Sequence, residues 1–259
     1  MKLPLYQVDA FAKERFSGNP AAVCPLEDWL PDSTLQAIAL ENNLSETAFI
    51  VPQNGGYHLR WFTPAVEVDL CGHATLATSH VLKQHLNDGS KVFRFFTRSG
   101  ELQVRCEDDQ YIMNFPALPS AAIDPPQLLV DLLGKVPLYV SKRMDYLVRL
   151  ESQEEVEEFQ PDMSRIAQLD ARGLIITAPG RKVDFVSRFF GPQSGVPEDP
   201  VTGSAHCILT PYWAQETGKT SFHARQLSKR GGHVWCELKE DRVELRGDAV
   251  TVMVGEMWI

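Results

Sequence analysis

Two short loops of small residues carry the strongest chemical signal in the sequence. Each places a glycine directly before a helical pattern: Gly72-His73-Ala74-Thr75 and Gly203-Ser204-Ala205-His206. The first N–H groups of a helix have no partner inside the helix, and the helix dipole adds partial positive charge there. A small anion such as a carboxylate can bind these groups without lysine or arginine. Either loop alone is equally consistent with a tight turn, but two matched loops favour a ligand site.

Three side chains near these loops could carry or direct a proton. Glu46 stands between a helical pattern and the apolar run TAFIV, where desolvation would raise its pKa and suit it to general acid–base chemistry. His73 could donate to a substrate or assist the proton transfer. Asp199 could cap a helix or orient a ligand. Taken alone, Glu46 also fits a surface residue at an element boundary, and His73 a structural histidine.

The elements that would position these residues occur twice along the chain. The tripeptide Arg60-Trp61-Phe62 is matched by Arg188-Phe189-Phe190, which lies 128 residues later, and Gly72 is matched by Gly203, which lies 131 residues later. We therefore predict two copies of one α/β unit that face each other. Alternation and apolar runs predict strands at residues 3–10, 47–51, 57–63, 91–97, 101–107, 110–115, 173–178 and 183–190, and helices after Ser33 and Gly72.

The proline-rich segment 116–126 is typical of a linker. We place the domain boundary there and predict an N-terminal half of residues 1–117 and a C-terminal half of residues 118–259. The final strand is expected to pack back on the first half. The acidic segment 151–166 is interpreted as a solvated surface.

Composition and charge limit the classes of function. A chain of 259 residues with 44% apolar residues can bury a sizeable core. Its formal net charge of -9 disfavours a nucleic-acid partner, and its sequence has no apolar run long enough to span a membrane. The first residues resemble a strand rather than a signal peptide. Five scattered cysteines, an odd number without a CxxC pair, suggest a reducing cytoplasm.

Four ordered motifs resemble the PhzF family, the phenazine-biosynthesis PhzF-like proteins with the diaminopimelate epimerase fold. They are GNPAAV (Gly18–Val23), NLSETAF (Asn43–Phe49), FTPAVEVDLCGHATLA (Phe62–Ala77) and EDPVTGSA (Glu198–Ala205). The resemblance implies an α+β/α/β fold of two pseudo-symmetric halves, each a mixed, barrel-like sheet around a central helix. It also implies an active site in the cleft between the halves and a homodimer.

The resemblance further implies a cofactor-free, metal-free isomerase that acts on a small carboxylate such as trans-2,3-dihydro-3-hydroxyanthranilate. The family's catalytic glutamate falls on Glu46, with His73 and Asp199 assisting protonation and positioning. Backbone amides near Gly72, His73, Gly203 and Ser204 would hold the substrate carboxylate or neighbouring polar atoms. Asn19, in the GNP motif, would contact the ligand.

Two rival functions remain open from the sequence. The same fold hosts two-cysteine racemases and epimerases, and Cys71 stands where one thiol would sit. The counterpart of Cys71 in the second half is Pro200 or Thr202, and neither is a thiol. A non-catalytic member that binds a metabolite or a protein is the other alternative. No complete metal-ligand set, GxGxxG or Walker A motif is present, so we expect no metal and no nucleotide cofactor.

Overall fold

The computed structural model describes residues 1–259 and divides into two compact units. Unit 1 comprises Met1–Asn114 together with Arg246–Ile259, and unit 2 comprises Phe115–Leu245. The first boundary lies close to the one expected after residue 117. The last strand of the chain, however, is part of unit 1, so unit 2 is inserted between two segments of unit 1.

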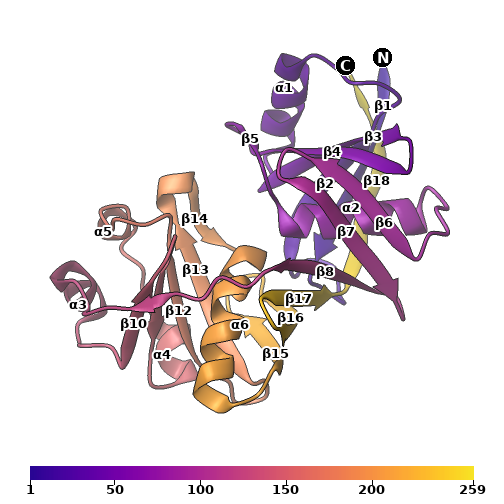
Figure 1. Cartoon of the computed structure of the whole chain (residues 1–259). Coiled ribbons are helices and arrows are strands. Elements are labelled where there is room, and N and C mark those ends of the chain that lie inside the picture. The colour runs from indigo at the N-terminus through magenta and orange to yellow at the C-terminus, as the bar shows by residue number, and fades with distance from the viewer. The chain divides into compact units, whose positions relative to one another are not determined.

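Unit 1 is a mixed sheet of strands with two helices (Figure 1). The strands are β1 (Lys2–Ala10), β2 (Asn19–Pro25), β3 (Glu46–Gln53), β4 (Gly56–Phe62), β5 (Glu67–Val68), β6 (Val92–Thr97), β7 (Gly100–Glu107), β8 (Gln110–Pro116) and β18 (Ala249–Trp258), and the helices are α1 (Asp32–Asn42) and α2 (Gly72–Gln84). Neighbours pair in the order β18-β1-β2-β3-β4-β6-β7-β8, with β5 also on β4. The β2–β3 and β4–β6 pairs are parallel and the others are antiparallel.

Unit 2 repeats this topology. Its strands are β9 (Ala121–Ala122), β10 (Tyr139–Lys142), β11 (Tyr146–Arg149), β12 (Leu174–Pro179), β13 (Phe185–Gly191), β14 (Val196–Asp199), β15 (Ser221–Gln226), β16 (Gly232–Lys239) and β17 (Arg242–Gly247). Its helices are α3 (Gln127–Leu133), α4 (Gln153–Glu158), α5 (Met163–Ile166), the 3₁₀ turn η1 (Pro192–Ser194) and α6 (Gly203–Thr217). Strands β10 to β16 pair with the same directions as β1 to β7. The predicted duplication is therefore present in the backbone.

Two ion pairs mark equivalent positions in the duplicated units. Arg60 binds Glu67 with an Nε–Oε1 distance of 2.7 Å in unit 1, and Arg188 binds Glu198 at 2.7 Å in unit 2. Each guanidinium also lies over a phenylalanine two residues further along its strand. The repeat seen in the tripeptides thus extends to side-chain contacts.

Helix α2 is the buried centre of unit 1. Every residue from His73 to Leu82 is buried, and the helix packs against β1, β2, β3, β7 and β18. A helix that is covered on all sides must satisfy its polar side chains internally. The hydroxyls of Thr75, Thr78 and Ser79 do so by donating to the carbonyl four residues before each of them. This arrangement matches the central helix that the family resemblance implies.

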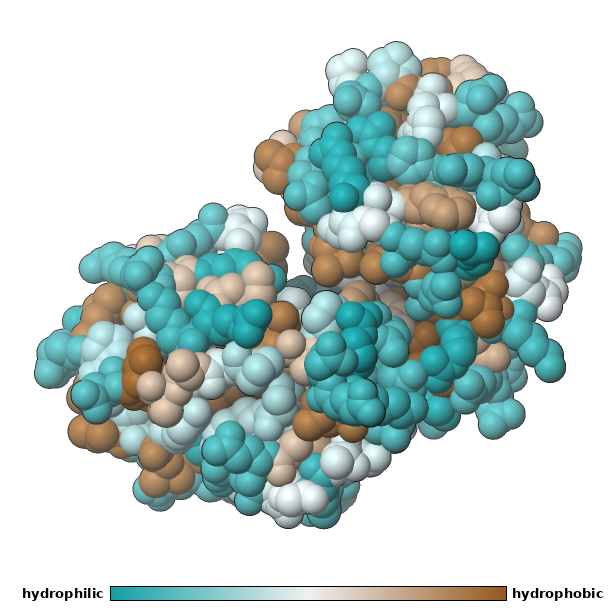
Figure 2. All heavy atoms as spheres, in the orientation of Figure 1, coloured by the Kyte–Doolittle hydropathy of each residue, from teal (hydrophilic) through white to brown (hydrophobic).

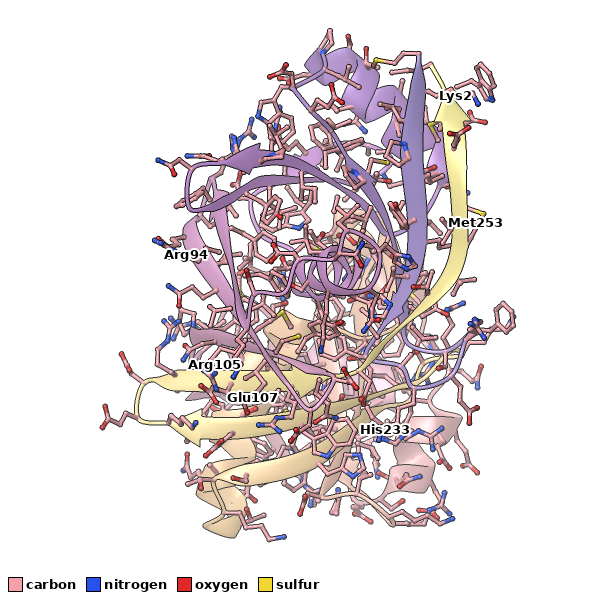
Figure 3. All side chains as sticks on the ribbon, turned by 90° about the vertical axis from the view of Figure 1, so that its right-hand side faces the viewer. Lys2, Arg94, Arg105, Glu107, His233 and Met253 are labelled. Carbon is pink, nitrogen blue, oxygen red and sulfur yellow. The ribbon has the colours of Figure 1, made fainter.

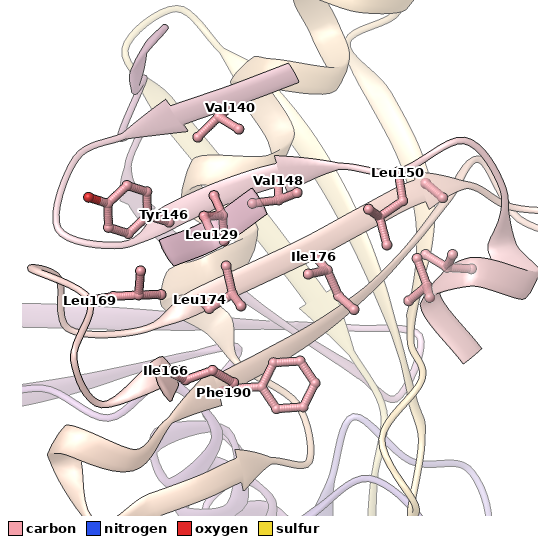
Figure 4. Packing of buried hydrophobic residues seen from close by; sticks show 13 residues of the cluster. Leu129, Val140, Tyr146, Val148, Leu150, Ile166, Leu169, Leu174, Ile176 and Phe190 are labelled. Carbon is pink, nitrogen blue, oxygen red and sulfur yellow. The ribbon is translucent and has the colours of Figure 1, made fainter. Parts of the chain in front are cut away.

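Unit 2 has a separate apolar core. Figure 4 shows this cluster between the sheet and its helices. Its members are Leu129, Val140, Tyr146, Val148, Leu150, Val156, Ile166, Leu169, Leu174, Ile176, Ala178, Val186 and Phe190. The cluster includes Val156 of α4 and Ile166 of α5, so the acidic segment 151–166 forms two short helices that each anchor one apolar residue. The rest of that segment is mostly exposed, as expected.

The two ends of the chain meet on the outer strand pair of unit 1. Strand β18 runs antiparallel to β1, with Lys2 opposite Trp258, and the Met1 amine donates to the Ile259 carbonyl. Figure 3 shows Met253 on β18 beside this pair. Hydrophilic and hydrophobic side chains are mixed over the face drawn in Figure 2. None of the helices is long and apolar enough to cross a membrane.

Candidate active site

The candidate catalytic residues of unit 1 come from three elements that begin at one edge of its sheet. Asn19 is the first residue of β2, Glu46 is the first of β3, and α2 begins at Gly72. Strands β2 and β3 are parallel, with Ala21 opposite Glu46, so their first residues lie at the same edge. The sheet and its central helix therefore bring together residues that are far apart in the sequence.

Local backbone features hold these starting points in place. Gly18 adopts φ +64°, and a Cβ there would lie 2.2 Å from the Ala10 carbonyl oxygen, so no other residue fits the turn before Asn19. Helix α1 ends with Asn43 in the left-handed region at φ 48°. Asn42 then donates to the Thr47 hydroxyl at 3.0 Å, which ties the end of α1 to the strand that carries Glu46.

His73 is the centre of the buried cluster. Its Nε2 lies 3.1 Å from Oε2 of Glu46, and its Nδ1 lies 3.2 Å from Nδ2 of Asn19. The Cys71 sulfur lies 3.5 Å from the same Nδ1. In the neutral imidazole, a hydrogen bond donated by the Asn19 amide makes Nδ1 the acceptor and places the ring proton on Nε2, facing Glu46.

The Glu46 and His73 atoms that face each other have unused hydrogen-bonding capacity. The two atoms lie 3.1 Å apart and form an ion pair when His73 is protonated, but no hydrogen bond of standard geometry is made by the buried Oε2 or the buried Nε2. Only 15% of the Glu46 side chain and 7% of the His73 side chain is exposed. Buried polar atoms are normally hydrogen-bonded, so this pair is typical of a site that acts on a bound molecule.

The charges around His73 favour its protonated form. Burial lowers the pKa of the imidazole, but Cys71 and Glu46 beside it raise the pKa more strongly, and the net pKa lies well above its usual value. Burial, reinforced by the Glu46 charge, raises the pKa of the Cys71 thiol to about 11. The thiol therefore keeps its proton near neutral pH, and the Glu46 carboxylate is the group that favours a positive charge on His73.

The same cluster holds three types of metal ligand. Donor atoms of Glu46, Cys71 and His73 lie within 4.8 Å of one another. The Cys71 sulfur faces Nδ1 of the imidazole, whereas Glu46 faces Nε2. One metal ion binds only one of the two ring nitrogens, and each of these nitrogens faces only one of the other two donors. The cluster fits a proton-transfer site better than a metal centre.

In unit 2, the loop before α6 is fixed by a buried glutamine. Gln226 accepts from the Thr202 N–H at 2.9 Å and donates to the Asp199 carbonyl at 2.7 Å. The Thr202 hydroxyl in turn donates to Oδ2 of Asp199 at 2.6 Å. Thr202 is the residue that precedes α6, so these bonds set the direction of the helix start at Gly203. Asp199 thus belongs to the loop that presents Gly203 and Ser204.

A cation lies beside this helix start, which the sequence did not predict. Arg172 pairs with the buried carboxylate of Asp145 and also donates to the Ser204 hydroxyl at 2.9 Å. Gln226 was likewise missed. Asp145, Arg172 and Gln226 each lie tens of residues from the loop in the sequence. The only signal for them was the repeat, which aligns the segment before β12, where Arg172 lies, with the segment before β3.

The duplicated topology identifies counterparts between the units. Cys71 precedes α2 and Thr202 precedes α6, so Thr202 is the counterpart of the thiol, and Ser204 is that of His73. The registers Thr47↔Phe62 and Leu174↔Phe190 make Gly173 the counterpart of Glu46. A two-cysteine mechanism needs a thiol from each half, and the threonine disfavours that rival function.

The structure thus gathers Glu46, His73 and Asn19 in unit 1 and gathers Asp199, Gly203 and Ser204 in unit 2. Asn19 was expected to contact the ligand. It is fully buried and its amide contacts the imidazole of His73, and the contact with a ligand stays a prediction.

Comparisons with known proteins agree over nearly the whole chain. A family model described as phenazine biosynthesis-like protein matches residues 8–255. An uncharacterized isomerase of Pseudomonas aeruginosa is 53% identical, with 99% of both chains covered. A human phenazine biosynthesis-like domain-containing protein is 40% identical, again over 99% of both chains. A crystal structure of a PhzF-family protein from Enterococcus faecalis has a TM-score of 0.98 at 45% identity, with both chains fully covered.

Proposed function

Because the chain belongs to the PhzF family, we propose that it is an isomerase that moves a proton within a small carboxylate substrate without a cofactor. Glu46 is the proposed general acid and base. The observation that carries this proposal is the buried Glu46–His73 pair, whose facing atoms have no hydrogen-bond partner. A carboxylate in this setting can take a proton from a bound molecule and return it to the same molecule.

The proposed reaction is a proton shift between two carbons. Oε2 of Glu46 takes the proton from an acidic C–H, the electron pair of that bond forms a new double bond to the adjacent carbon, and the π pair of the former double bond moves to the far carbon. The same carboxyl group then delivers the proton to the second carbon, and the double bond moves with it. His73, whose pKa is raised, donates from Nε2 and stabilises the negative charge that develops on the substrate.

Unit 2 is proposed to bind the substrate carboxylate. The N–H groups at Gly203 and Ser204 open a fifteen-residue helix and have no helical partners. The equivalent groups at Gly72 and His73 are proposed to hold polar atoms of the same substrate. Asp199, fixed by Thr202 and Gln226, is proposed to assist positioning. By family resemblance, the substrate is like trans-2,3-dihydro-3-hydroxyanthranilate.

Deuterium incorporation tests this proposal. The protein is incubated in heavy water with dihydro-hydroxyanthranilate and a panel of small carboxylates, and carbon-bound deuterium is followed by NMR. We expect Glu46→Gln to lower the exchange rate about 10²- to 10⁴-fold, the usual contribution of a general acid–base. The matched control is Glu41→Gln, because Glu41 lies exposed on α1.

The outcomes of this experiment separate the candidate functions. Exchange by the wild type that Glu46→Gln retains would overturn the assignment of the base. Binding of a carboxylate without exchange across the panel would instead support a non-catalytic binding protein.

Two further properties are proposed from the sequence. A homodimer is the family-level expectation, and sedimentation of the purified protein tests it. A cytoplasmic location is supported by five free cysteines, four of them buried, which suit a reducing compartment. Fractionation of the source cells tests the location.

A further inference from the structure

Asp145, Arg172 and Ser204 form a cluster at the start of α6. The Arg172 guanidinium donates two hydrogen bonds to the Asp145 carboxylate, from Nε to Oδ1 at 2.9 Å and from Nη2 to Oδ2 at 2.5 Å. Nη2 also donates to the Ser204 hydroxyl at 2.9 Å. Asp145 is fully buried, whereas 34% of the Arg172 side chain is exposed. One edge of the guanidinium is thus fixed in the protein and the rest reaches solvent.

A count of donors shows what this cluster can offer. Arginine has five N–H groups, and Arg172 uses those of Nε and Nη2, which leaves the two on Nη1 without a partner. The Ser204 oxygen accepts from Arg172, so its own proton is free to be donated elsewhere. The guanidinium plane is held by Asp145 on its edge and by the Phe189 ring 5.3 Å away. The unused donors are therefore ordered before any ligand binds.

We propose that Arg172 is a substrate-binding residue that, together with Ser204, binds the anionic group of the substrate. This inference rests on the proposed function, because it assigns a second partner to the carboxylate expected at the start of α6. It also adds a source of affinity for the carboxylate, because a fixed guanidinium binds it together with the N–H groups at the start of α6. The donors that remain, the two N–H groups of Nη1 and the Ser204 hydroxyl, can each donate to an oxygen of a carboxylate.

The duplication of the fold supports this assignment. Ser204 is the counterpart of His73, and Gly173, which directly follows Arg172, is the counterpart of Glu46. In unit 1, the first residue of β3 faces the helix start with a carboxylate, whereas in unit 2 a residue just before β12 faces it with a guanidinium. We therefore assign the proton acceptor to unit 1 and the residue that binds the anionic group to unit 2.

Asp145 determines how the cation acts. The carboxylate balances the charge of Arg172, so long-range attraction of anions is weak and recognition depends on the donors that remain. Replacing Arg172 alone would leave Asp145 buried without its partner and would destabilise unit 2. A double variant, Asp145→Asn with Arg172→Gln, removes both charges and keeps two amides able to bond to each other.

Binding of benzoate and of its neutral analogue benzamide tests the proposal, with NMR titration of the full chain as the readout. We expect Arg172→Gln and the double variant to bind benzoate about ten- to a hundredfold more weakly, the usual effect of losing a charge-assisted hydrogen bond, with benzamide binding little changed. Arg172→Lys keeps the charge but lacks the two fixed N–H groups of Nη1, so its affinity for benzoate should lie between those of the wild type and Arg172→Gln. The control is Arg181→Gln, because Arg181 forms exposed pairs with Glu154 and Glu157.

Unchanged benzoate affinity in a folded Arg172→Gln or double variant would overturn the proposal, as would an equal loss of benzoate and benzamide binding. The result is independent of the chemistry at Glu46. If the proposed isomerase reaction fails, deuterium exchange is absent while benzoate binding still depends on Arg172. If the Arg172 assignment fails, Glu46-dependent exchange persists while benzoate binding does not respond to Arg172.

Discussion

The buried histidine of α6 predicts a specific loss of stability in mild acid. His206 is completely buried, and burial lowers its pKa to about 4, partly offset by its contact with the Thr202 carbonyl. Nδ1 lies 2.8 Å from that carbonyl oxygen, while Nε2 is buried without a partner. A proton added to Nε2 would place an unpaired charge in the core, so His206 binds a proton less readily in the folded chain than in the unfolded chain.

The sign and size of the effect follow from linkage. Between pH 6.5 and pH 4 the unfolded chain binds a proton at His206 and the folded chain does not, so stability falls as the pH falls through this window. The full difference of about 2.5 pKa units corresponds to about 3 kcal/mol, of which about 2 kcal/mol is lost between pH 7.5 and pH 5. With a typical urea dependence, that loss lowers the unfolding midpoint by about 1 M.

The assay compares wild type with His206→Gln by urea unfolding, followed by circular dichroism at pH 7.5, 6 and 5. Glutamine still reaches the Thr202 carbonyl but does not titrate in this range. Other groups contribute to both proteins, so the quantity of interest is the difference in their pH dependence. We expect the midpoint of the variant to fall less than that of the wild type. Equal pH dependence in the two proteins would refute the reasoning.

Two further predictions concern the loops before α2 and α6. Cys71→Ser should keep deuterium exchange within about tenfold of wild type, because the thiol, with a pKa of about 11, carries its proton near neutral pH; a loss of 10²-fold or more would point to thiol chemistry. Gln226→Leu should destabilise the protein by about 2–4 kcal/mol in urea unfolding, because it leaves the Thr202 N–H and the Asp199 carbonyl without their partner. A cost no larger than that of Gln160→Leu, at an exposed site, would show that Gln226 does not hold the loop.

The sequence predicted those features that depend on local pattern or on repetition. Alternation located strands such as β4 and β13, and the spacing of Arg60 and Arg188 revealed the duplicated unit that the ion pairs of both residues confirm. The glycines at the two helix starts were equally visible, because a glycine beside small residues is a local signal. The family resemblance then placed Glu46, and the structure shows it beside His73.

Long-range contacts could not be predicted in this way. Nothing near Arg172 indicates that its guanidinium reaches Ser204, and nothing near Gln226 indicates that its side chain holds Thr202. The same limit applies to the contact between Asn19 and His73, which depends on the parallel pairing of β2 with β3. Such roles depend on which strands become neighbours.

The pairing of the first strand with the last has a consequence for synthesis on the ribosome. Lys2 pairs with Trp258, so β1 has no partner on that side until almost the whole chain has been translated. At about 5–20 residues per second, the delay is on the order of 10–50 seconds. Residues 115–245 are all translated during this interval, so unit 2 can begin to fold before unit 1 is complete. We therefore expect a nascent chain in which unit 2 folds before unit 1. The unpaired edge of β1 is then the segment that we expect molecular chaperones to protect.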